Sequence, residues 1–188
     1  LAGGRPGDAV SALLTVCTAC TLVLQFRLWD DLADLPADRL ADPERVLAGA
    51  ASLAPFRTAL VALMLVNLIL LGAAPQPWPR LCGFALLNTV FAAWYHARAW
   101  QDRLRSPLMN AHVVLAKYPA FVVLLAPEAL VRTPLVLAMA AIYLCLAVHE
   151  LLHDRRLGSR PGARTSLAAD LAGLGAVAAL SLILRSPI

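Results

Sequence analysis

Long apolar stretches alternate with short polar connections along the whole chain. A helix that crosses a bilayer needs about 20 predominantly apolar residues. On this basis the pattern predicts transmembrane helices at roughly 9–29, 52–74, 81–100, 108–127, 130–150 and 166–185. The connections are too short for a soluble domain, so we expect an all-α fold. Residues 1–188 would form a single transmembrane domain, a polytopic bundle of about six spans.

Composition and charge agree with a membrane protein. Hydrophobic residues make up 60% of the 188 residues, charged residues only 15%, and the mean hydropathy is +0.71. This composition excludes an ordinary soluble domain. If the connection after the first span is cytoplasmic, that side carries eleven of the fifteen arginines, as the positive-inside rule requires. The arginines lie at helix ends without interleaved aromatic residues, which argues against a nucleic-acid partner.

The largest concentration of acidic residues follows the first apolar stretch. Half of the chain's twelve acidic residues lie in one short segment: Asp30, Asp31, Asp34, Asp38, Asp42 and Glu44. On a helix, a spacing of four stacks carboxylates along one face, where they repel one another unless a cation lies between them. Mg²⁺ suits such oxygen ligands together with phosphate. Asp31, Asp34 and Asp38 are the first candidates for metal ligands, and the alternative is a solvated acidic loop.

A second polar cluster ends the fifth predicted span. It contains His149, Glu150, His153, Asp154 and the following Arg155. Because successive spans alternate in direction, we expect it on the same membrane face as the acidic segment, where arginines could bind phosphate. The string from His149 to His153 also matches the helical zinc-protease motif. A third zinc ligand would then be needed, and His96, His112 or Asp170 could supply it.

Isolated polar residues also interrupt the apolar stretches. Lys117, followed by Tyr118, lies near the middle of the fourth span, where a lysine usually faces the bundle interior or a wet cavity. It could contact a diphosphate, or it could extend to the membrane surface if the span is shifted. Asn67, Asn88 and Asn110 are expected to form hydrogen bonds between helices.

The acidic motifs resemble those of the UbiA-type intramembrane prenyltransferases. The family's first motif is Asn or Asp, then Asp-x-x-Asp-x-x-x-Asp, and residues Asp30 to Asp38 match each acidic position. In the second motif, Glu150 stands where an Asp is usual, Asp154 matches, and a third acidic position is Gly158. Family members have nine transmembrane helices, of which this chain would supply the second to the seventh, as a fragment or a short homologue.

The resemblance implies an enzyme that transfers a prenyl group from a prenyl diphosphate to a lipophilic acceptor, often aromatic, with Mg²⁺ as cofactor. It assigns metal binding to Asp31, Asp34, Asp38, Glu150 and Asp154. Catalysis would use Asp31, Asp34, Asp38 and Lys117. Diphosphate binding would use Arg27, Asp30, Arg39, Arg45, Tyr118 and Arg155.

Two other functions remain open. The altered second motif allows a non-catalytic membrane homologue that binds lipid or a protein partner, and the histidine string allows an intramembrane zinc protease. The expected location is a bacterial inner membrane, with the aspartate-rich face in the cytoplasm.

Overall fold

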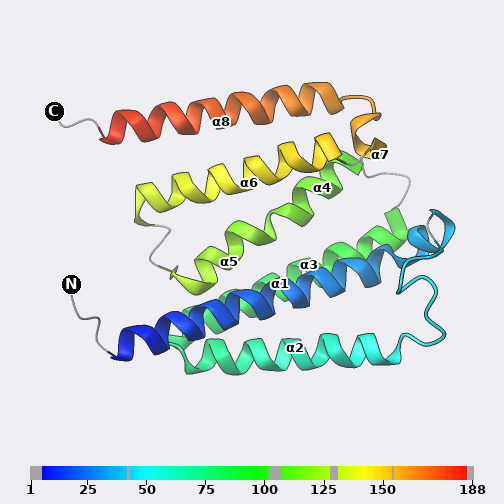
Figure 1. Cartoon of the computed structure of the whole chain (residues 1–188), viewed down its shortest axis with the longest axis horizontal. Coiled ribbons are helices and arrows are strands. Elements are labelled where there is room, and N and C mark those ends of the chain that lie inside the picture. The colour runs from blue at the N-terminus through cyan, green and yellow to red at the C-terminus, as the bar shows by residue number, and fades with distance from the viewer. Residues whose placement is uncertain (1–5, 42, 102–106, 128–130, 154, 186–188) are drawn as a thin grey trace. The chain divides into compact units, whose positions relative to one another are not determined.

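The computed structural model describes residues 6–41, 43–101, 107–127, 131–153 and 155–185, and within these ranges the chain is helical and has no strand (Figure 1). The helices are α1 (Pro6–Ala41), α2 (Ala54–Ala73), α3 (Pro77–Gln101), α4 (Pro107–Leu115), α5 (Lys117–Leu125), α6 (Thr133–His153), α7 (Arg155–Gly158) and α8 (Ala163–Arg185). The predicted all-α class is confirmed. The chain divides into two compact units, Leu1–Leu86 and Leu87–Ile188, with the boundary inside α3.

In the first unit, α1 and α2 pack side by side (Figure 1). Their contact buries apolar side chains, Leu22 and Phe26 from α1 and Leu71 from α2. Asn67 of α2 is fully buried at the same interface; it donates a hydrogen bond from Nδ2 to Gln25 Oε1 (2.9 Å) and accepts one from the Thr21 hydroxyl (2.6 Å). Buried polar groups of this kind hold helices together where no water is available. The interhelical role predicted for Asn67 is confirmed.

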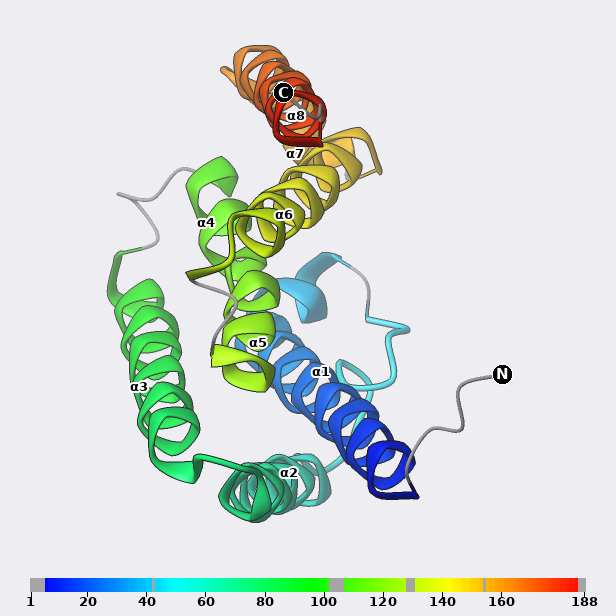
Figure 2. The same cartoon turned by 90° about the vertical axis from the view of Figure 1, so that its left-hand side faces the viewer.

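In the second unit, α6 lies between α8 and the α4–α5 pair (Figure 2). Leu151, Leu157 and Ala163 form a buried cluster at one end, against which Leu108 and Leu167 pack. Near the middle of the α6–α8 contact, a Cβ atom placed on Gly173 would lie 3.1 Å from Leu144 Cδ1. The missing side chain therefore lets the two helices approach closely, as small residues do in membrane bundles.

The fourth predicted span is broken into α4 and α5 at Ala116. Pro119 has no backbone N–H, so the carbonyl of Leu115 loses its donor from the next turn. The amide of Ala116 lies 3.1 Å from the His112 carbonyl and 3.2 Å from the Val113 carbonyl, which marks the tightened turn. The break places Lys117 at the first position of α5.

The outer surface of the helices is apolar, as in a membrane protein. Leu13, Ile69 and Ile183 expose 63%, 69% and 68% of their surfaces, and many other large apolar side chains are similarly exposed. Soluble monomers rarely expose so many large apolar side chains. Among the described residues, five segments are long and apolar enough to cross a membrane: Ala9–Leu40, Ala54–Ala73, Leu108–Leu125, Thr133–His153 and Ala163–Leu184. The chain is an integral membrane protein.

Candidate functional site

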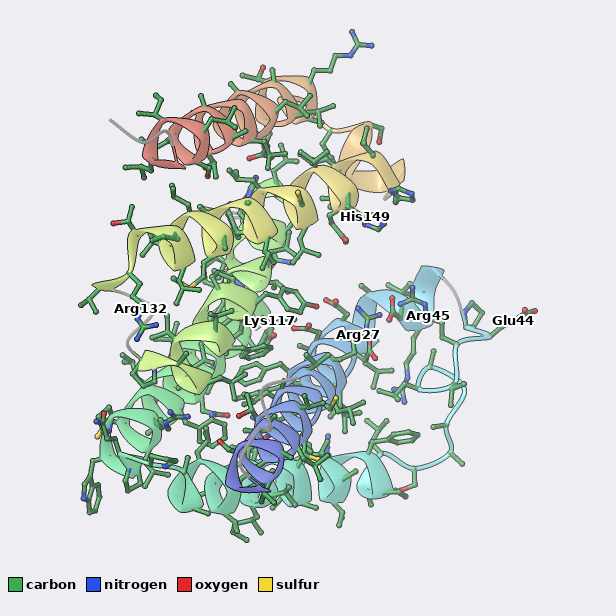
Figure 3. All side chains as sticks on the ribbon, turned by 60° about the vertical axis from the view of Figure 1, so that its left-hand side comes forward. Arg27, Glu44, Arg45, Lys117, Arg132 and His149 are labelled. Atoms are coloured by element: carbon green, nitrogen blue, oxygen red, sulfur yellow. The ribbon has the colours of Figure 1, made fainter. Side chains whose placement is uncertain are left out.

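The acidic segment is helical and continues α1 without interruption. The predicted first span ended near residue 29, whereas α1 extends to Ala41 with Pro36 inside it. At about 100° per residue, Asp30, Asp31, Asp34 and Asp38 fall within an arc of about 100° around the helix axis. We call these four residues the aspartate stripe. Asp42 lies outside the described residues, and Glu44 is exposed and points away from α1 (Figure 3).

Two arginines pair with the aspartate stripe. Arg27 Nη2 lies 3.4 Å from Asp31 Oδ1, one turn along the helix. Arg45 follows the end of α1, and its Nη1 donates a 2.8 Å hydrogen bond to Asp38 Oδ2. The Asp38 side chain is only 16% exposed, so this pair is partly shielded from water. The backbone bond from Gly49 N to Arg45 O (2.9 Å) closes the turn that holds Arg45 in place.

The other stripe positions differ in burial. Asp30 is 7% exposed, Asp31 and Asp34 are half-buried, and Arg39 is exposed. Burial of a carboxylate is unfavourable unless the charge is compensated. Burial in the stripe is therefore greatest at Asp30, and the two arginines lie beside Asp31 (36% exposed) and Asp38 (16% exposed).

The metal prediction stays a prediction. Within the described ranges, no three His, Cys, Asp or Glu side chains gather into a preformed metal-binding group. The stripe carboxylates extend along the helix and meet arginines. Mg²⁺ commonly binds through one or two carboxylates, its remaining ligands being water and substrate phosphate. The stripe can offer such pairs of carboxylates, for example Asp31 and Asp34, which are three residues apart on one face.

The second predicted cluster, at the end of α6, has a different arrangement. The rings of His149 and His153 are stacked, with centroids 4.0 Å apart and planes 10° from parallel. His153 Nδ1 lies 3.0 Å from the His149 carbonyl oxygen. Ring lone pairs lie in the ring plane, so stacked parallel rings do not direct them to one zinc ion. Glu150 is half-buried, and Asp154 and the side chain of Arg155 lie outside the part of the chain that the structure describes.

Lys117 is buried, as predicted for a lysine that faces the interior. It is 2% exposed, and its Nζ lies 5.4 Å from the centroid of the Tyr118 ring. Tyr118 in turn packs edge-on against Phe121. The lysine belongs to the second unit and the aspartate stripe to the first, so their joint action on one substrate stays a prediction.

A third group of polar residues was not recognised as a site from the sequence. The ring of His112 in α4 forms a hydrogen bond with Tyr143 of α6, in which Nδ1 lies 2.9 Å from the tyrosine hydroxyl. Its Nε2 lies 3.1 Å from the Ser166 hydroxyl and 4.0 Å from Asp170 Oδ2, both on α8. We call these four residues the His112 cluster. The sequence offered His112 and Asp170 only as possible third zinc ligands, and Tyr143 and Ser166 only as single polar residues in or beside apolar stretches.

Comparisons with protein-family models, with curated proteins and with solved structures found no match.

Proposed function

We propose that this membrane protein is a Mg²⁺-dependent prenyltransferase, which moves a prenyl group from a prenyl diphosphate to a lipophilic acceptor. The observation that carries the proposal is the aspartate stripe, held on one face of α1 and flanked by Arg27 and Arg45. The resemblance of this segment to the first UbiA-type motif supplies the reaction class.

The position of the stripe along α1 fits an amphiphilic substrate. The membrane-crossing part of α1 begins at Ala9, and about 20 residues cover a hydrocarbon core of about 30 Å. The helix therefore reaches the interface near Trp29, and the stripe begins at the next residue. A diphosphate bound there would lie in the polar interface while its isoprenoid tail remained among apolar helices.

The negative charge of the aspartate stripe favours a diphosphate that is bound through metal ions. Four carboxylates repel a free diphosphate, so an anionic substrate needs cations between itself and the stripe. Mg²⁺ can bridge carboxylate and phosphate oxygens. Arg27 and Arg45 already lie beside stripe carboxylates, and their side chains are 65% and 53% exposed. Both can turn to phosphate oxygens, for which guanidinium groups are well suited.

The chemistry then follows from charge stabilisation. Breaking the bond between the prenyl carbon and the diphosphate oxygen leaves the electron pair on diphosphate and a cation on the allylic carbon. Arg27 and Arg45 would stabilise the leaving diphosphate, and Mg²⁺ held by the stripe carboxylates would supply further positive charge there. The acceptor forms a bond to the allylic carbon and then loses a proton. Apolar surroundings protect the cation from water.

Binding of a radiolabelled prenyl diphosphate to the full chain in nanodiscs tests the proposal. We expect binding that requires Mg²⁺ and that Asp31→Asn and Asp34→Asn each reduce by at least tenfold, since each removes a carboxylate from the proposed metal ligands. Glu44→Gln is the matched control, because it removes a nearby carboxylate that points away from α1 (Figure 3). It should leave binding unchanged.

Diphosphate release in the presence of candidate acceptors separates the alternatives. Release that depends on Mg²⁺ supports prenyl transfer. Mg²⁺-dependent binding without release, for every prenyl length and acceptor class tried, would favour the non-catalytic homologue. Equal binding by wild type, Asp31→Asn and Asp34→Asn would refute the site.

A further inference from the structure

The His112 cluster joins three helices at a buried polar centre within the second unit. His112 comes from α4, Tyr143 from α6, and Ser166 and Asp170 from α8. Asp170 is 7% exposed, and two of the same helices, α6 and α8, also carry the buried apolar residues Leu151 and Ala163. Ionisable side chains in membrane-crossing segments are unfavourable and usually serve a function.

Asp170 is the unexplained member of the cluster. Its Oδ2 atom is inaccessible to solvent and has no hydrogen-bond partner among the described residues. The nearest cationic group identified for it is the His112 ring, whose Nε2 lies 4.0 Å away. A buried carboxylate oxygen with no donor is unfavourable when the group is ionised beside a neutral imidazole. One additional proton removes that penalty.

We propose that the His112 cluster is a proton-binding site inside the membrane, in which His112 and Asp170 hold one proton between them. The proton has two alternative positions. It can convert the ring to imidazolium beside an ionised carboxylate, or it can sit on the carboxyl beside a neutral ring. Both forms leave the pair with no net charge, which is what a low-dielectric site favours.

The hydrogen bonds around His112 also provide a route through the ring. Imidazole has two distinct nitrogens, so it can accept a proton at one and release a proton from the other. A proton that arrives at Nδ1 from the Tyr143 side can be matched by one that leaves Nε2 toward Ser166 or Asp170. The ring changes tautomer, and no electrons are exchanged. The titratable groups in contact with His112 are Tyr143 from α6 and Asp170 from α8.

Two spectroscopic measurements on the full chain in nanodiscs at neutral pH test this proposal. Histidine ¹⁵N chemical shifts report the ring protonation, with the His112 signals assigned by their loss in His112→Gln. Infrared absorption of the protonated carboxyl, assigned by its loss in Asp170→Asn, reports the other partner. We expect either a doubly protonated ring or a protonated carboxyl in the wild type.

The variants should respond reciprocally. In His112→Gln the proton can reside only on Asp170, so the carboxyl band should appear or strengthen. In Asp170→Asn the ring should become neutral, whereas Asp31→Asn, which removes a carboxylate far along the chain, should change neither signal. Unfolding in mixed micelles identifies any variant that loses its fold, and the wild-type measurement stands without variants.

Three results would overturn the proposal. The first is a neutral His112 ring beside an ionised Asp170 in the wild type. The second is an ionised Asp170 in a folded His112→Gln protein. The third is a stoichiometric metal ion, found by elemental analysis of the purified wild type and lost in Asp170→Asn, because a metal ion would then neutralise the pair in place of the proton.

Discussion

The hydrogen bonds of Asn67 allow us to predict how much the contact between α1 and α2 contributes to the free energy of unfolding. Replacing Asn67 with leucine preserves most of the side-chain volume but removes both interhelical bonds, to Thr21 and to Gln25. Polar contacts between membrane helices contribute about 0.6 kcal/mol on average and up to about 1.7 kcal/mol. The buried Gln25 Oε1 would also lose its Asn67 donor, which adds to the penalty. We therefore expect Asn67→Leu to lower the free energy of unfolding by about 1–3 kcal/mol.

A double-mutant cycle isolates the contribution of one bond. The Thr21 hydroxyl has a single proton, for which the carbonyls of Cys17 (3.0 Å) and Thr18 (3.1 Å) compete with Asn67 Oδ1 at 2.6 Å. Thr21→Val removes the hydroxyl with little change of shape. If the shorter contact receives the proton, Asn67→Leu and Thr21→Val should be coupled by about 0.6 kcal/mol or more.

Reversible unfolding in mixed micelles with increasing sodium dodecyl sulfate, followed by tryptophan fluorescence, gives the four free energies of the cycle. The two single changes would be additive within about 0.5 kcal/mol if the bond contributed nothing. Additivity of that kind would refute the reasoning. Cys17→Ala is the control, because it retains the Cys17 backbone carbonyl that competes for the Thr21 proton.

Three other changes test features of the fold and of the proposed site. Gly173→Val adds atoms where a Cβ already lies 3.1 Å from Leu144 Cδ1, so the same unfolding assay should show a loss of about 1–3 kcal/mol, and Gly173→Ala a smaller one. Pro119→Ala restores a backbone donor to the break in the fourth span. Hydrogen exchange should then become slower around that position, and unchanged exchange would contradict the assigned cause of the break. Arg45→Gln removes the pair with Asp38, whose arginine is 53% exposed, and should change stability by less than about 1 kcal/mol. The same variant should weaken Mg²⁺-dependent prenyl diphosphate binding, and equal affinity would exclude Arg45 from the site.

The sequence predicted the helical class and five of the spans found among the described residues, because apolar length alone determines both. The predicted span 81–100 corresponds to α3. It also predicted that the acidic residues share one helix face, since spacing fixes that once the segment is helical. The break at Ala116 was not predicted, although Pro119 was visible, because membrane helices often tolerate proline. The partners of Asn67 likewise depended on packing.

The His112 cluster shows most clearly where sequence reasoning ends. Its members come from three segments separated by more than twenty residues, and each appears as a lone polar residue in an apolar stretch. No spacing rule connects them. Their proximity arises from the packing of α6 against α4 and α8. The two histidines at the end of α6 illustrate the reverse case, since their spacing fits a zinc motif while their rings stack on each other.

Because α1 is continuous, the part of it that packs against α2 inside the membrane is rigidly connected to the aspartate stripe at the membrane surface. The side of α1 that carries Thr21 and Gln25 lies about 150° around the axis from the centre of the aspartate stripe, so α2 holds one side of the helix and the carboxylates occupy nearly the opposite side. A slip of one residue in the pairing of α1 with α2 would turn the stripe through about 100°. The hydrogen bonds of Asn67 thus fix the rotation of α1 about its own axis relative to α2. That rotation determines the direction in which the carboxylates face at the interface.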